Sequence, residues 1–157
     1  MGEAPKSLVL GRVVEVQITD EGLRAKLQRL DRPEGIVTDW ITVASPMVGP
    51  EVGVLFAPEI DDLAVVAYSA KRAIILGFIT GGASGAATDD VNERIISSRD
   101  QNMIILIDGD QSGITLKDKH DNQIVMNQDG ISIKTNGKLT LEAVQTTAIK
   151  GATVELN

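Results

Sequence analysis

Apolar and polar residues alternate along the first half of the chain in short runs that are typical of β-strands. In Leu23–Gln28, Leu and Ala alternate with Arg, Lys and Gln, and Leu8–Thr19 shows a similar alternation toward its end. The segment Thr19-Asp20-Glu21-Gly22 between these runs has the composition of a hairpin turn. Further strand-like runs follow at Trp40–Ala44, Gly53–Ala57, Leu63–Tyr68 and Ala73–Thr80, punctuated by Pro46, Pro50 and Pro58. Five or six short strands in about 75 residues, without a helical period, predict a small all-β barrel or sandwich.

The second half repeats a shorter apolar unit that is separated by Asp-Gly, Asp-Asn and Asn-Gly turns. In its last part the period is eight residues, because Ile131 and Ile133 are followed by Leu139 and Leu141, and later by Ile149. Apolar residues alternate with Ser, Thr, Glu or Ala, which is the period of a strand with one solvent-facing side. The units are Ile104–Ile107, Ile114–Leu116, Ile124–Met126, Ile131–Ile133, Leu139–Leu141, Ala148-Ile149 and Val154–Leu156.

Strands this short are not expected to be stable in one isolated copy. Each would bury two side chains at roughly 1.5–3 kcal/mol apiece, and ordering the backbone costs about 1–2 kcal/mol per residue. Repeats that cannot cover their own apolar face stack on neighbours, and with so few repeats the neighbours would be other chains. We therefore predict an obligate homotrimer, an intertwined trimeric β-helix that forms a needle. Its core would contain Ile131, Ile133, Leu139, Leu141 and Ile149.

The two patterns meet at the small-residue stretch Gly81–Ala87, which predicts a linker. We expect a barrel domain at residues 1–82, a linker at 83–93 and the trimeric β-helix at 94–157. The first residues, Met1–Lys6, lack the charged-then-apolar build of a signal peptide. Synthesis in the cytoplasm without a signal peptide is therefore expected.

Charge and composition narrow the possible partners. The net charge is −7, and an acidic surface disfavours unspecific contact with nucleic acid or anionic lipid. The chain has no cysteine, which excludes disulfides and thiolate metal sites. Trp40 could stack on a nucleic-acid base, but the half that carries it is net acidic and poor in other aromatic residues. Packing in the core or at an interface is the favoured interpretation of Trp40.

Few residues offer catalytic or metal-binding chemistry. His120, the only histidine, has no evident nucleophile or orienting partner, so a surface turn is favoured. Asp108–Gly113 imitates the start of a calcium loop, but its twelfth position is Lys119 where a bidentate Glu is required. The paired acids Asp61-Asp62 and Asp89-Asp90 would point to opposite faces of a strand, and Asp61-Asp62 is interpreted as a turn. We predict no enzymatic activity, no cofactor and no metal site.

Four segments resemble the phage baseplate assembly protein V and VgrG families. Asp39–Pro46 is similar to their Trp-containing stretch, Phe56–Tyr68 to their Pro-Glu motif, and Ala73–Gly82 to the segment that follows it at family spacing. Gly11–Val14 matches the usual opening strand, so the resemblance runs in order through residues 8–82. The downstream repeats are similar to the β-helix of these spikes. The barrel-motif residues, expected to be structural, are Trp40, Pro46, Pro58, Asp62, Leu76 and Gly77.

This resemblance implies an OB-fold barrel and a non-catalytic role as the central spike of a contractile tail. The spike would cap the inner tube and pierce the target envelope when the sheath contracts. Its implied partners are two further copies, inner tube and hub proteins, a separate PAAR-type tip protein and, transiently, the target membrane, but no nucleic acid. It would reside in the baseplate of a virion or injection-system particle. Two alternatives stay open: an OB-fold oligomer that binds nucleic acid, and a β-helical tail-associated glycan hydrolase.

Overall fold

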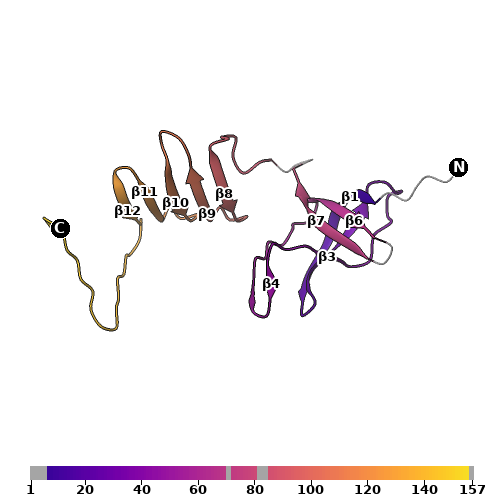
Figure 1. The fold of residues 1–157 in the computed structure, drawn as a ribbon, viewed down its shortest axis with the longest axis horizontal. Coiled ribbons are helices and arrows are strands. Elements are labelled where there is room, and N and C mark those ends of the chain that lie inside the picture. Colours follow the sequence, from indigo (N-terminus) through magenta and orange to yellow (C-terminus); the bar gives the residue numbers. More distant parts are fainter. Residues whose placement is uncertain (1–6, 70–71, 81–84, 156–157) are drawn as a thin grey trace. The chain divides into compact units, whose positions relative to one another are not determined.

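The computed structural model describes residues 7–69, 72–80 and 85–155. All regular elements in these residues are β-strands, which confirms the all-β prediction. The chain divides into two compact units, Met1–Ala86 and Ala87–Asn157 (Figure 1). Several predictions fall on residues outside the described ones: the absence of a signal sequence at Met1–Lys6, part of the linker at Gly81–Ser84, and the end of the last apolar unit at Leu156.

The first unit is a closed five-stranded barrel with the strand order β1-β2-β3-β7-β6. Strand β6 pairs with β1 and closes the ring. The neighbours are antiparallel, except that β3 and β7 run parallel. The strands are β1 (Leu8–Thr19), β2 (Gly22–Arg29), β3 (Ile41–Val43), β6 (Leu63–Tyr68) and β7 (Ala73–Ile79).

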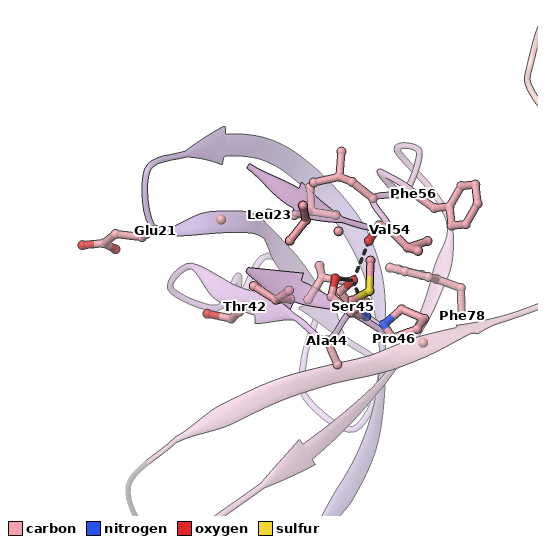
Figure 2. Close-up of a pocket in the computed structure, with 17 residues that line it drawn as sticks. Glu21, Leu23, Thr42, Ala44, Ser45, Pro46, Val54, Phe56 and Phe78 are labelled. Carbon is pink, nitrogen blue, oxygen red and sulfur yellow. Dashed lines mark hydrogen bonds between the residues drawn. The ribbon is translucent and has the colours of Figure 1, made fainter. Parts of the chain in front are cut away.

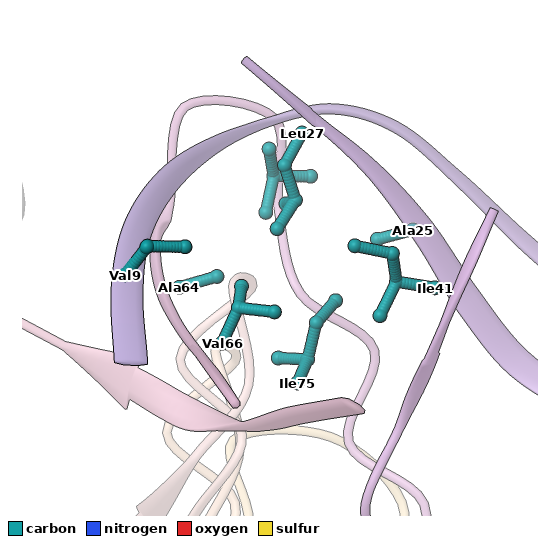
Figure 3. Close-up of a cluster of buried hydrophobic side chains, with 8 residues drawn as sticks. Val9, Ala25, Leu27, Ile41, Ala64, Val66 and Ile75 are labelled. Carbon is teal, nitrogen blue, oxygen red and sulfur yellow. The ribbon is translucent and has the colours of Figure 1, made fainter. Parts of the chain in front are cut away.

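The barrel core is built from alternate, inward-facing positions of its strands. On β2, for example, Ala25 and Leu27 are fully buried, and the residues between them are only partly so. The long strand β1 contributes in the same way, but Gly11 takes one inward position, where a Cβ would lie 3.0 Å from the Cβ of Leu27. Glycine there allows β1 to pass close to β2. Figure 3 shows the cluster, which consists of Val9, Val13, Ala25, Leu27, Ile41, Ala64, Val66 and Ile75.

The strand predicted at Gly53–Ala57 is wrong. In its place a two-residue hairpin pairs β4 (Val48–Gly49) with β5 (Val52–Gly53), and the chain then leaves the ladder. The backbone N–H of Val54 donates to Met47 O, and the Ser45 hydroxyl donates to Val54 O at 2.5 Å. These two bonds occupy the backbone N–H and C=O of Val54, so neither group is available to a strand ladder. The apolar residues that follow line a cavity and are not part of a sheet.

The second unit is a five-stranded antiparallel meander in which each strand pairs with the next along the chain (Figure 1). Four of the predicted apolar units become strands, whereas the strand β8 was missed. The units predicted at Leu139–Leu141, Ala148-Ile149 and Val154–Leu156 form no strand within one chain, as far as residues 135–155 are described. One chain by itself thus forms a meander and no β-helix. The strands are β8 (Glu93–Ser97), β9 (Met103–Ile107), β10 (Gly113–Lys117), β11 (Gln123–Asn127) and β12 (Gly130–Lys134).

The turns of this meander agree with the interpretation of the sequence. Asp108–Ser112 connects β9 to β10, and the carboxylate of Asp108 pairs with Arg94 at 2.5 Å. His120 is exposed in the turn between β10 and β11. The predictions of plain surface turns at both places are confirmed.

Replacing Gly113 with alanine is expected to destabilise the second unit by about 1–3 kcal/mol, the usual cost of overpacking. An added Cβ would lie 2.6 Å from the carbonyl oxygen of Met126, and both belong to paired backbones that cannot yield cheaply. Urea unfolding followed by far-ultraviolet circular dichroism measures the effect. Gly77→Ala is the matched control, because a Cβ on this strand glycine meets nothing within 4 Å. Equal unfolding midpoints for the two variants would contradict the prediction.

Candidate functional site

One face of the meander carries two rows of side chains, which are apolar on all five strands in the first row and on four of the five in the second. In the first row, Ile104 lies opposite both Ile96 and Leu116, and Ile124 lies opposite both Leu116 and Ile133. The second row runs parallel to it and begins with the charged residue Arg94 on β8. Its apolar members are Leu106, Ile114, Met126 and Ile131.

These rows are poorly covered in a single chain. The exposed fractions are 49% for Ile96, 41% for Leu106, 73% for Ile131 and 55% for Ile133. The opposite face is interrupted by polar residues, Thr115, Lys117 and Ser132, although it also carries Ile105 and Val125. A continuous apolar face of this kind marks an interaction surface in a folded protein. Association with other chains is the way in which this sheet can bury it.

Only two of the five residues predicted for the needle core lie on this face. Ile131 and Ile133 alternate with Ser132 along β12 and end the two rows. Leu139, Leu141 and Ile149 lie in the segment without in-chain strands and are exposed by 54%, 66% and 65%. One chain therefore does not bring the five together. Their joint burial stays a prediction that requires further copies.

Sequence reasoning named three apolar units before β12, Ile104–Ile107, Ile114–Leu116 and Ile124–Met126, but did not assign their residues to the needle core. In β8, β9 and β11 the apolar residues are consecutive, so the sequence alone does not show which of them share a face. Their place on one face depends on the registers of four successive strand pairs. Turn lengths set those registers, and the sequence pattern did not define them.

The barrel-motif residues occupy different environments. Pro58 is buried, and Trp40 is half-buried with the Lys26 ammonium 4.7 Å from its ring centroid. Leu76 is 55% exposed, because its neighbour Ile75 takes the inward position on β7. Two others, Pro46 and Gly77, line the cavity beside the β4–β5 hairpin.

Asp62 connects the loop before β6 to an irregular part of β1. Its carboxylate accepts a hydrogen bond from the backbone N–H of Glu59 at 2.8 Å. Its carbonyl accepts one from Val13 N–H at 2.9 Å, and Asp61 N–H donates to Val13 O at the same distance. The register of β1 against β2 shifts between Val13 and Glu15. The predicted turn at Asp61-Asp62 is confirmed, and burial raises the pKa of the Asp62 carboxyl.

Asp62→Asn is expected to be at least as stable as the natural chain at pH 7, whereas Asp62→Ala should lose about 0.5–1.5 kcal/mol with the Glu59 hydrogen bond. A raised pKa means that ionising the Asp62 carboxyl costs the folded state free energy. This cost is absent below the pKa that the carboxyl has in the unfolded chain, and it grows as the pH rises through its pKa in the folded chain. The advantage of Asn over Asp should therefore shrink toward acid pH. Unfolding midpoints of the three chains between pH 3 and 7 test this. An Asn variant as unstable as the Ala variant at pH 7 would refute it.

A mostly apolar cavity of about 320 Å³ lies beside the β4–β5 hairpin (Figure 2). Its lining includes Leu23, Val54, Phe56 and Phe78. Glu21 is the only titratable residue among the described lining residues, and its carboxylate forms an ion pair with Arg24. The cavity thus lacks the two facing carboxyl groups that glycoside hydrolysis ordinarily requires.

Two aromatic side chains of the first unit, Trp40 and Tyr68, are covered by cations of the same chain. Lys26 lies over Trp40, and the Arg29 guanidinium lies 4.9 Å from the ring centroid of Tyr68. Both cations are also neutralised, Lys26 by Glu15 at 3.1 Å and Arg29 by Asp31 at 2.7 Å. The hydrogen bond from Arg29 lowers the pKa of the Asp31 carboxyl. This arrangement leaves no open aromatic platform with free positive charge at these two rings, which argues against the nucleic-acid alternative.

Within residues 7–69, 72–80 and 85–155, no three His, Cys, Asp or Glu side chains are placed to hold a metal ion together. In the same residues no helix has the length and apolar character needed to cross a membrane.

Comparison with known proteins agrees with the two-unit architecture. Residues 9–81 match the family model of the type VI secretion system/phage-baseplate injector OB domain, and this stretch holds the closed barrel. Residues 93–157 match the phage baseplate V C-terminal trimerisation domain, which holds the sheet with the two apolar rows. A search of the curated proteins found no match. The chain belongs to the phage baseplate V family and is a structural baseplate protein that joins an injector OB domain to a trimerisation domain.

Proposed function

We propose that the chain is the homotrimeric central spike of a contractile injection particle, with barrels that cap the inner tube and a needle that pierces the target envelope. The observation that carries this proposal is the apolar face of the second unit, which a single chain leaves exposed. Three such faces, packed against one another, close a prism with a dry interior. The match of the same residues to a trimerisation domain supports three as the number of copies.

The mechanism is mechanical and needs no reacting group. Sheath contraction drives the spike forward, and a narrow tip concentrates the force on a small area of the envelope. Each of the five strands in the second unit is held to its neighbours by a backbone ladder. Residues 135–155 would wind with the other copies into the intertwined β-helix of the needle. The load would then be shared among many hydrogen bonds and three chains.

The finer partners of this proposal follow from the family resemblance. They are the inner tube and hub proteins behind the barrels and a separate PAAR-type protein at the tip. The target membrane would be touched only during injection. The spike would reside in the baseplate of a phage or injection-system particle.

Native mass spectrometry of the purified chain tests the trimer, and we expect a species of three chains that appears as a rod in negative-stain images. Particles assembled without this chain test the spike itself, and we expect them to lack a functional baseplate and to fail to deliver their contents. Particles that assemble and inject normally without the chain would overturn the proposal. Salt-dependent binding of DNA, or hydrolysis of cell-wall glycan by the purified trimer, would favour one of the two alternatives.

A further inference from the structure

The sequence contains a single Asn-Gly pair, Asn136-Gly137, which lies just after β12. Both residues are exposed and belong to no strand. The other asparagines of the described residues precede Glu, Met or Gln, and three of the four stand directly before a strand: Asn92, Asn102, Asn122 and Asn127. Asn136 alone is thus followed by a residue that has no side chain and a wide choice of backbone conformations.

An asparagine in this setting can react with the backbone of the next residue. The backbone nitrogen of Gly137 attacks the side-chain carbonyl carbon of Asn136, and the new C–N bond closes a succinimide ring. The side-chain nitrogen leaves as ammonia and takes up the proton that the backbone nitrogen gives up. Water then opens the ring at either carbonyl, which gives aspartate or isoaspartate. In isoaspartate the main chain passes through the former side chain and is longer by one carbon atom.

The attacking nitrogen is held by a chain of hydrogen bonds that begins in the β10–β11 turn. Gly137 N–H donates to the Thr135 hydroxyl at 3.0 Å, a bond from a threonine to the backbone two residues on. The same hydroxyl donates to the side-chain carbonyl of Asn122 at 2.6 Å, and the Asn122 amide donates to the Asp118 carboxylate at 2.7 Å. Because the hydroxyl has a fixed acceptor, its oxygen stays turned toward the Gly137 N–H.

We propose that Asn136 is a site of spontaneous deamidation and that the Thr135 hydroxyl slows the reaction by holding the Gly137 N–H. The bond to Thr135 must break before the nitrogen can lose its proton and turn toward the Asn136 side chain. The reaction would add a negative charge, and in isoaspartate an extra main-chain carbon, just after the last strand of the sheet. This modification site is independent of the proposed spike function, and its failure would leave that function untouched.

Peptide mass spectrometry of the purified full chain, kept in mildly alkaline buffer, tests the site. We expect the peptide with Asn136 to gain the mass of an amide-to-acid exchange over time and to separate into aspartate and isoaspartate forms. Gly137→Ala should slow this gain, because a Cβ hinders the attacking nitrogen. The fold should accept that change, since the nearest atom to the added Cβ is the Thr135 hydroxyl oxygen at 3.7 Å. A natural chain whose Asn136 stays intact, or reacts no faster than the other asparagines, would overturn the site.

Thr135→Val tests the role of the hydroxyl, because valine keeps the shape of the side chain and cannot accept the Gly137 N–H. The deamidation rate at Asn136 should rise by roughly three- to tenfold, the factor that corresponds to one hydrogen bond. Thr135→Ser restores the hydroxyl and should return the rate to that of the natural chain. The rates at Asn122 and Asn127 should not change. An unchanged rate at Asn136, or an equal rise at all three asparagines from general loosening of the sheet, would refute the restraint by Thr135.

Discussion

Replacing Ile133 with aspartate should abolish the homotrimer and leave the barrel folded. Ile133 is 55% exposed in a single chain, so the charge is tolerated there, but in the closed prism three carboxylates would meet near the axis. Burying each of them costs roughly several kcal/mol, and their mutual repulsion adds to this cost. Native mass spectrometry should show monomers. The fluorescence of Trp40, the only tryptophan and a residue of the barrel, should keep its folded signal.

Ser132→Asp provides the matched control for this experiment. It places the same carboxylate on the same strand, but on the face opposite to the two apolar rows, because successive side chains of a strand alternate between its faces. This variant should remain a trimer. A heat-resistant Ile133→Asp trimer would show that the apolar rows are not the buried seam.

Much of the fold could be predicted from the alternation of residues. The ranges Leu8–Thr19 and Leu63–Tyr68 agree with β1 and β6 at both ends, because each has an inward apolar face. The turn assignments also hold, since Asp, Asn and Gly favour tight turns through their own backbone preferences. In both cases a local property of the sequence determines the local structure.

Other features depend on tertiary contacts that no local pattern contains. Gly53–Ala57 reads as a strand, but cross-bonds from Ser45 and Met47 turn it into the wall of a cavity. On β7 the successive residues Ile74, Ile75 and Leu76 are all apolar, so the sequence does not show which of them points inward. In the closed barrel Ile75 is buried and Leu76 is exposed. The composition of β8 does not predict a strand, because only two residues in its interior are apolar. Its backbone pairing with β9 identifies it as a strand.

The candidate site was predictable only at its C-terminal end. The eight-residue period identified Ile131 and Ile133 because the repeat there is regular. The earlier strands are joined by turns of different length, five residues between β9 and β10 and two between β11 and β12, so their apolar residues have no common period. Only the paired registers show that they continue the same two rows. A regular repeat thus reveals the end of this face, while the rest follows from the folded sheet.

Replacing Leu27 with alanine should destabilise the barrel by about 2–5 kcal/mol, the range for a fully buried leucine. Leu27 has no exposed surface and is among the largest fully buried side chains of the core. Gly11 on β1 lies against the Leu27 side chain and has no side chain of its own to fill the space left behind. A loss of this size is a large part of the stability of an ordinary domain. The urea midpoint of Trp40 fluorescence, which reports on this unit, should fall markedly.

Leu30→Ala is the matched control for this change. Leu30 follows β2 closely in the sequence and is 50% exposed, so its truncation removes a similar number of atoms and leaves little cavity. Its backbone N–H bond to Leu10 O is unaffected by the substitution. We expect the Leu30→Ala midpoint to stay close to that of the natural chain. If both variants lose equal stability, the loss comes from general apolar content and the assignment of Leu27 to a tightly packed barrel core is wrong.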